Sequence, residues 1–374
     1  MQSNVGDLSY LEQIAVRPDW HEPSDLLGYV SRIGGEHYVA TPFLKFIAKA
    51  WRDAFVSVDA NGFYTLNPEA KTHWVCLDEM NLAPVEQYFA DYLSLIETRQ
   101  WRDGQYRCDA IFKPFELPFT KDNKEAALNH LAEELGFANG DDALWQHFCS
   151  KEVGMPIPPN LIVAGTVNMD ETTHGFSRKV IDRALTIDFG VFFPNDFSAF
   201  LDPKTTNKKI NFSSYSDVEG VDLSTLKYAA ADGTDVHMVD ASIALMTEIN
   251  AVVKGTPFEL AYRALNEMLV ALACYTPTDE ATLHAVWDDF LMGKLLPRLE
   301  GDAEKLRSVD DTKSLLTQLS ALLATRLHSG AGQRLDLLRE NKDGRPLLIE
   351  YRSLAKLKWM QERLVRDSFT SFWP

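Results

Sequence analysis

The stretch at residues 74–79 constrains the fold more than any other part of the chain. Its sequence, Trp-Val-Cys-Leu-Asp-Glu, is an apolar run that ends abruptly in two adjacent carboxylates, Asp78 and Glu79. An apolar run of this length with polar residues around it is typical of a buried strand in a parallel sheet. Two acids buried together at the end of a strand are costly unless a cation or substrate compensates them, so the pair predicts a binding site.

Phosphoryl transfer is the chemistry that needs two neighbouring acids at such a strand end. One acid helps to hold Mg²⁺, largely through its water shell, and the other orients or deprotonates the attacking water. We expect Asp78 to be the metal-side acid and Glu79 to be the water-activating one. Because Asp-Glu pairs are common, the alternative is a strand that merely exits into a polar loop.

Composition and charge describe an ordinary globular chain that is acidic overall. The 374 residues suffice for two or three domains, and 45% of them are hydrophobic. The net charge of −17 disfavours non-specific binding to nucleic acid, so DNA contact is expected only through an upstream domain or a partner. No apolar run approaches the ~20 residues that span a bilayer, and the N-terminus carries no secretion signal. The four cysteines show no C-x-x-C spacing. We expect a cytoplasmic protein without a zinc site, a disulfide framework or membrane contact.

A second apolar run, at residues 161–167, ends at Asn168. The gap between Glu79 and Asn168 is longer than one crossover helix needs, and an inserted helical segment at about 120–152 accounts for the excess. Because parallel strands present their carboxyl ends to the ligand, we expect Asn168 to lie beside the two acids. A neutral amide there can hold the attacking water or contact the γ-phosphate.

Two arginines follow the second run and complete the candidate site. Arg178 and Arg183 are predicted to lie on one short helix, ahead of a third strand-like run at 185–193. A permanently charged, forked donor beside such a strand is suited to stabilising the charge on a transferred phosphoryl group. The alternative for either arginine is a surface ion pair, for example with Asp182 or Asp188.

The rest of the chain divides by composition. Residues 195–239 are polar and predict a connector with a small ribbon. From about residue 240 the pattern is helical, and the best domain boundary lies there. Helices are expected at 240–254, 258–274, 279–299, 311–328 and 351–366.

Taken in order, these features resemble the AAA+ ATPases, and within them the McrB family, the NTP-hydrolysing motors of modification-dependent restriction. The resemblance covers most of the chain. It rests on Arg17-Pro18-Asp19-Trp20, Leu26-Leu27-Gly28-Tyr29, Leu77-Asp78-Glu79-Met80-Asn81-Leu82-Ala83, Gly165-Thr166-Val167-Asn168, Ala261-Tyr262-Arg263-Ala264-Leu265-Asn266-Glu267, Lys294-Leu295-Leu296-Pro297-Arg298-Leu299-Glu300-Gly301, and residues 353–373 with Lys356-Leu357 and Ser371-Phe372-Trp373.

The resemblance implies an α/β fold, in which an N-terminally truncated AAA+ parallel sheet of the P-loop type occupies residues 1–193. A connector at 194–239 and an all-α lid at 240–374 would follow. It also implies roles for single residues. Asp78 and Glu79 would be the Walker B pair, Asn168 sensor 1, Arg183 the arginine finger with Arg178 as a second candidate, and Arg263 the sensor 2 arginine that contacts nucleotide.

The ligands and partners implied by the resemblance are those of a ring motor. Mg²⁺ would be the cofactor and ATP or GTP the substrate, and the sequence does not distinguish the two bases. The chain would form a homo-oligomeric ring, with a hexamer as the expected size, and would act with a McrC-like nuclease subunit.

One departure from the family pattern is serious, because the chain contains no G-x-x-x-x-G-K-[ST] phosphate loop. We therefore expect the chain to begin downstream of that loop, to bind nucleotide weakly when alone and not to hydrolyse it. A second hypothesis is a non-catalytic ring or interaction subunit that lends Arg183 in trans to a neighbour with a phosphate loop. A nuclease is a third hypothesis, resting on Glu340-Asn341-Lys342 and Pro18-Asp19, which are patterns frequent by chance.

Overall fold

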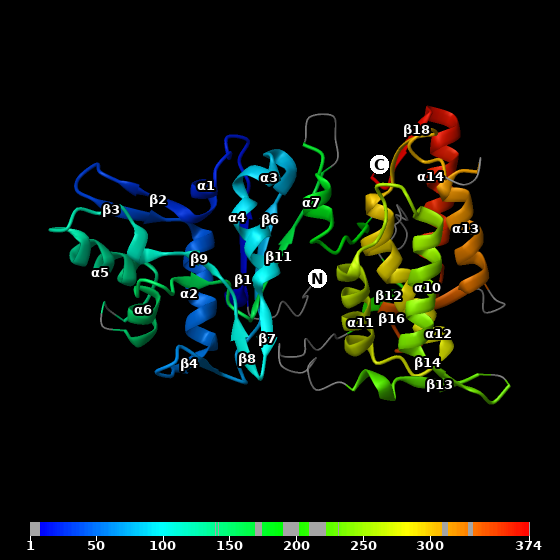
Figure 1. The fold of residues 1–374 in the computed structure, drawn as a ribbon, viewed down its shortest axis with the longest axis horizontal. Helices are drawn as coiled ribbons and strands as arrows, with labels where there is room; N and C mark the ends of the chain where they lie inside the picture. Colours follow the sequence, from blue (N-terminus) through cyan, green and yellow to red (C-terminus); the bar gives the residue numbers. More distant parts are fainter. Residues whose placement is uncertain are drawn as a thin grey trace. The chain divides into compact units, whose positions relative to one another are not determined.

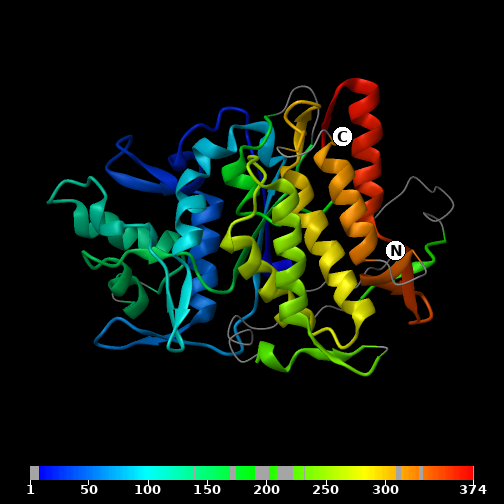
Figure 2. The same cartoon turned by 45° about the vertical axis from the view of Figure 1, so that its right-hand side comes forward.

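The chain forms two compact units. The computed structural model describes residues 8–138, 140, 142–168, 174–189, 202–208, 222–230, 232–308, 313–327 and 332–373. Among these residues, the division falls between Val180 and Ile181 (Figures 1 and 2). We call the part up to residue 180 the sheet unit and the part from residue 181 the helical unit. The division thus differs from the sequence-based boundaries at 193 and 240.

A three-stranded parallel sheet organises the sheet unit. The strands are β1 (Leu11–Ala15), β6 (His73–Asp78) and β11 (Leu161–Gly165), and β6 lies in the middle (Figure 1). The two apolar runs therefore form neighbouring parallel strands, as predicted, with Val75 of β6 opposite Val163 of β11. The strand on the other side of β6 was missed, because β1 is a short edge strand that fully buries few side chains.

Helices and ribbons complete the sheet unit. Helix α2 (Pro42–Ala54) packs against β1 and β6. It begins where the Thr41 side chain accepts a hydrogen bond from the backbone of Leu44, a common N-cap. The predicted insertion at about 120–152 is helical. The remaining helices and strands of the unit are α1 (Pro23–Leu27), β2 (Gly28–Ser31), β3 (His37–Ala40), β4 (Phe55–Val58), β5 (Tyr64–Leu66), α3 (Val85–Tyr88), α4 (Ala90–Leu95), β7 (Gln100–Arg102), β8 (Gln105–Arg107), β9 (Ala110–Phe112), α5 (Lys124–Glu134), α6 (Ala143–Phe148), β10 (Met155–Pro156) and the start of α7 (Arg178–Ile181).

Five long helices pack side by side in the helical unit (Figures 1 and 2). Each of the five helices predicted after residue 240 is present, with ends shifted by a few residues. The third continues into a π-helical segment, Leu291–Leu295, and a 3-10 turn, Leu296–Arg298. The helices are α10 (Met238–Val253), α11 (Tyr262–Tyr275), α12 (Glu280–Phe290), α13 (Leu315–Arg326) and α14 (Arg352–Asp367).

The prediction of an all-α lid is wrong, because the helical unit also contains β-sheet. An antiparallel sheet has the order β12 (Thr205–Asn207), β16 (Gln333–Asn341) and β17 (Pro346–Glu350). The side chains that β16 buries at its start are Arg334 and Asp336, which are charged. Burial of charge disguised the alternation by which a strand is recognised. Two-stranded ribbons also occur, β13 (Lys227–Ala229) with β14 (Asp235–His237) and β15 (Glu300–Asp302) with β18 (Phe369–Ser371).

The third strand-like run, predicted at 185–193, does not form a strand in its described part. Residues 185–188 lie outside any sheet, and residues 190–193 lie outside the described ranges. The backbone N–H of Thr186 donates to the carbonyl of Gly293, so the segment is fixed to the helical unit instead. No helix in the described ranges combines the length and the apolar character needed to cross a membrane.

Candidate functional site

The two acids lie at the carboxyl end of the central strand. Asp78 is the last residue of β6 and is half-buried, whereas Glu79 is exposed. The expectation that both acids are buried is therefore wrong. Glu79 adopts a left-handed conformation with φ 51° and ψ 48°, which turns the chain out of the sheet and into a 3-10 turn. Such a conformation is uncommon for a residue other than glycine, and it is often found at functional sites.

The hydroxyl of Thr166 joins the two acids. It donates to Oδ1 of Asp78 at 2.6 Å and accepts the backbone N–H of Glu79 at 2.8 Å. Gln13 of β1 donates to the second carboxylate oxygen of Asp78 at 2.9 Å. These two hydrogen bonds, first from Thr166 and then from Gln13, hold the pKa of Asp78 below its usual value. Gln13 on β1 and Thr166, directly after β11, thus orient one ionised carboxylate at the end of β6.

Asn81 ties the backbone of Asn168 to the same edge. The Asn81 side chain is fully buried, and its amide nitrogen donates to the carbonyl of Asn168 at 2.8 Å and to that of His174 at 3.2 Å. Its amide oxygen accepts the N–H of Asn168 at 3.3 Å. The backbone of Asn168 is thus tied to the turn that follows the two acids, and the joint role of the Asp78, Glu79 and Asn168 side chains stays a prediction. Sequence reasoning missed the roles of Asn81 and Thr166; the available signal was a lone amide inside the apolar stretch that follows the acids.

The glycine at the end of β11 makes room for the turn after the acids. A Cβ atom on Gly165 would lie 2.1 Å from the sulfur of Met80, so the Met80 side chain occupies the space that a larger residue would need. The N–H of Met80 also donates to the carbonyl of Thr166 at 2.9 Å. Packing of the Met80 side chain over the backbone accounts for this glycine in the 165–168 block.

The two candidate finger arginines belong to different units. Arg178 is the first residue of α7 and lies in the sheet unit, where the N–H of Ser177 donates to Glu86 at 2.6 Å. Burial raises the pKa of Glu86, but the hydrogen bonds from Ser177 outweigh it and leave that pKa below its usual value. Arg183 does not lie on the helix as predicted, because α7 ends at Ile181 and the chain turns there.

The remaining predicted residue, Arg263, lies in the first turn of α11 and is exposed. Its position early in a helix of the helical unit agrees with the sequence. Arg183 and Arg263 thus share one unit, while the edge that carries Asp78, Glu79 and Asn168 belongs to the other.

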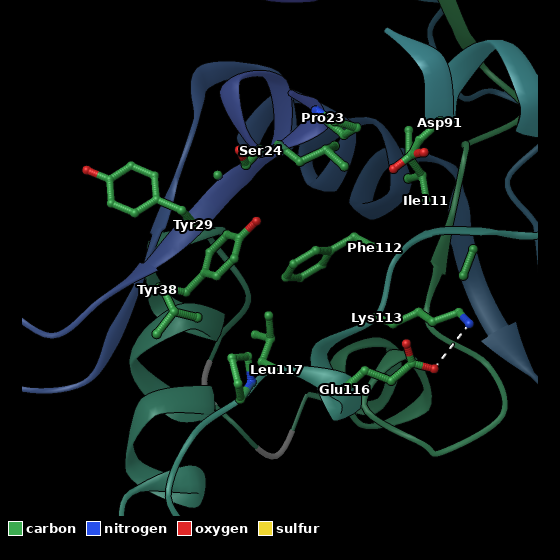
Figure 3. A pocket seen from close by; sticks show the side chains of 15 residues that line it. Pro23, Ser24, Tyr29, Tyr38, Asp91, Ile111, Phe112, Lys113, Glu116 and Leu117 are labelled. Carbon is green, nitrogen blue, oxygen red and sulfur yellow. Dashed lines mark hydrogen bonds and ion pairs between the residues drawn. The ribbon is translucent and has the colours of Figure 1, made fainter. Parts of the chain in front are cut away.

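A separate hollow of about 530 Å³ lies in the sheet unit, and none of the predicted site residues lines it. Figure 3 shows the rings of Tyr38 and Phe112 pointing toward one another, whereas the Tyr29 ring points away; Asp91 and the Lys113–Glu116 ion pair also line the hollow. Leu27, Gly28 and Tyr29 of the 26–29 block line this hollow. Neither Asp78 nor Glu79 lines the hollow, so it does not join the 26–29 block to the edge of the sheet that carries these two acids.

The comparisons with known proteins concern mainly the helical unit. One family matches. A domain family described as of unknown function, DUF8727, covers residues 217–369, which is less than half of the chain. This range includes Arg263 but not Asp78, Glu79, Asn168 or either candidate finger. No curated protein matches the chain.

The hydrogen bond from Thr166 allows a test of the site that needs no ligand. Replacing Thr166 with valine should raise the pKa of Asp78, because a donor to the ionised form is lost. Since the folded-state pKa of Asp78 is depressed, its ionisation favours the folded state at pH above the unfolded value, and this contribution is lost as the pH falls through the folded pKa. A carboxylate NMR titration of Asp78 should show the midpoint move up, and an unchanged midpoint would contradict the assignment.

Proposed function

We propose that the chain is the NTPase module of a McrB-like AAA+ motor, which hydrolyses ATP or GTP in a ring when a phosphate loop is present. The observation that carries this proposal is the shared edge at which Thr166 and Asn81 hold Asp78, Glu79 and Asn168. An ionised carboxylate, an exposed carboxylate beside it and a neighbouring amide are the groups that in-line attack of water on a phosphoryl group requires.

The residues at this edge suit Mg²⁺ held largely through water. Among the described residues, no three acidic, histidine or cysteine side chains gather as a direct metal site. Mg²⁺ commonly keeps several waters and uses one or two carboxylates together with substrate phosphates. The carboxylate of Asp78 accepts one hydrogen bond on each oxygen, which leaves lone pairs for metal-bound waters. When bound, the ion would neutralise charge on the phosphates, and Asp78 would orient its water shell.

Each protein group has one task in this proposal. Glu79, exposed at the edge, accepts a proton from the attacking water, and Asn168 orients that water or the γ-phosphate. Arg183, or in second place Arg178, stabilises negative charge on the transferred group from a neighbouring subunit. Arg263 contacts the nucleotide from the helical unit. A McrC-like nuclease would be the partner of the ring, which we expect to be a cytoplasmic hexamer.

The alternative is a non-catalytic ring subunit that lends Arg183 in trans. It is favoured by one observation, the lack of a phosphate-loop motif in the 374 residues. The two functions differ in whether this chain's own acids bind Mg²⁺ and nucleotide.

Nucleotide binding by the chain itself separates these two functions. Saturation-transfer NMR, which detects weak ligands, would be recorded with ATP and GTP with and without Mg²⁺. We expect weak, Mg²⁺-dependent binding that Asp78→Asn weakens by about tenfold or more, because orienting groups around a metal are typically worth 10–100-fold. Asp91→Asn, outside the acidic edge, is the matched control and should change nothing. Absence of Mg²⁺-dependent binding to the unmodified chain would remove the proposal and leave the in trans alternative.

A further inference from the structure

A buried lysine holds the segment that carries Arg183. Lys294 lies in the π-helical segment after α12, and its side chain is only 2% exposed. Its ammonium contacts a carboxylate oxygen of Glu267 at 2.5 Å, the carbonyl of Asp182 at 2.7 Å and the carbonyl of Ala184 at 3.3 Å. An ammonium has three donors, and here each one has an acceptor. Two of the three acceptors are the backbone carbonyls on either side of Arg183.

The segment 182–189 is attached to the helical unit at several points along its length. Its even-numbered residues are fixed to the helical unit, since Asp182 and Ala184 bind Lys294, Thr186 binds the carbonyl of Gly293 at 3.0 Å, and Asp188 pairs with Lys356 at 2.8 Å. Its large apolar side chains are exposed, with exposed fractions of 67% for Leu185, 53% for Ile187 and 64% for Phe189, and Arg183 is partly buried.

The residue next to Lys294 allows the segment 182–189 to lie close to the π-helical segment. A Cβ atom on Gly293 would lie 2.7 Å from the Leu185 side chain and 3.1 Å from the carbonyl of Thr186, so the π-helical segment tolerates only a glycine there without a shift. Arg298 adds a second cation, whose Nε lies 3.3 Å from the carboxylate of Asp182. π-helical bulges of this kind are rare and occur frequently at functional sites.

We propose that Lys294 is a positioning residue for Arg183, fixing the backbone on both sides of that arginine to the helical unit. Glu267 neutralises the buried ammonium and keeps it available for the two carbonyls. The role given to Arg183 as a donor to phosphate rests on the proposed function; the attachment of its backbone does not. The consequence for a ring motor is that the helical unit sets where the Arg183 guanidinium lies.

Trypsin cleavage after Arg183 measures this attachment directly in the full chain. A protease must draw several residues into an extended, free conformation, so a held segment is cleaved slowly. Native chain and variants would be digested briefly well below their melting temperatures, and each cut site quantified by mass spectrometry. In Lys294→Met, which keeps the side-chain volume, cleavage after Arg183 should rise by about tenfold, because charge-assisted hydrogen bonds to two carbonyls are lost.

Two further variants separate positioning from general stability. Lys294→Arg retains charged donors and should restore much of the protection, whereas Lys305→Met removes an exposed lysine paired with Glu300 and should leave cleavage after Arg183 unchanged. A selective rise at Arg183 with rescue by arginine supports the proposal. No rise at Arg183, no rescue, or an equal rise at sites within α14 would overturn it, the last because Lys294 would then serve the unit as a whole. The result does not depend on nucleotide, so loss of the proposed function would leave it intact.

Discussion

Replacing Asp288 with asparagine should lower the free energy of unfolding of the helical unit by about 3–5 kcal/mol, the cost of removing one partner from a buried ion pair. Asp288 is fully buried. Its carboxylate accepts hydrogen bonds from Arg334 Nε at 2.6 Å and from the backbone N–H groups of Arg352 and Ser353 at 2.9 Å each. Asparagine keeps the shape, but it removes the charge and turns an NH₂ group towards other donors.

The same carboxylate joins three elements, which explains the size of the expected effect. It lies on α12, Arg334 lies on β16, and Arg352 and Ser353 are the first residues of α14. Their N–H groups would otherwise lack partners at the helix start. Native-state hydrogen exchange of the α14 amides measures the loss within the unit. Asp202→Asn, which disrupts an exposed pair with Lys342, is the control and should cost less than about 1 kcal/mol. Equal losses in the two variants would show that the buried network contributes little.

The second large effect concerns catalysis. When a phosphate loop is supplied in frame ahead of Met1, Glu79→Gln should lower NTP hydrolysis by about 10²–10⁴-fold, the usual contribution of a general base. Glutamine has the same shape as glutamate but cannot take up the proton of the attacking water. Nucleotide binding should persist, since Asp78 and Asn168 remain in place. Steady-state phosphate release and nucleotide binding, measured on the same preparations, separate the two steps.

A matched substitution controls for the loss of one acidic charge. Glu133→Gln changes an exposed residue on helix α5 and should leave turnover unchanged. If Glu79→Gln retained full turnover in a chain that hydrolyses NTP, Glu79 would not be the water-activating acid. The exposed position and left-handed backbone of Glu79 would then need another explanation.

The parts of the fold that sequence predicted well are those governed by apolar periodicity. The runs at 74–79 and 161–167 are continuous and apolar, and they form the neighbouring strands β6 and β11. The five helices after residue 240 carry apolar stripes and were found within a few residues of their ends. The expectation that Asn168 lies beside the acids comes from a general rule, since parallel strands end at one edge.

The parts that were missed depend on polar groups whose partners lie far away in sequence. Thr166 and Asn81 each form hydrogen bonds between segments more than 80 residues apart. The local sequence around a threonine or an asparagine does not indicate such a role. The sequence of strand β16 does not show which side chains are buried, because two of them, Arg334 and Asp336, are charged and are buried in ion pairs. The run from residue 185 reads as a strand by its alternation, but hydrogen bonds to the helical unit fix its even-numbered residues instead. Hydrogen bonds and ion pairs between residues far apart in the sequence produce no periodic pattern of apolar residues.

Helix α7 has a geometric consequence for the two arginines near it. The helix has four residues, and the division between the units falls before the last of them. Its entry is tied to Glu86 on one body, and its exit is tied to Lys294 on the other. Arg178 and Arg183, only five positions apart in the sequence, are therefore anchored by contacts within different units.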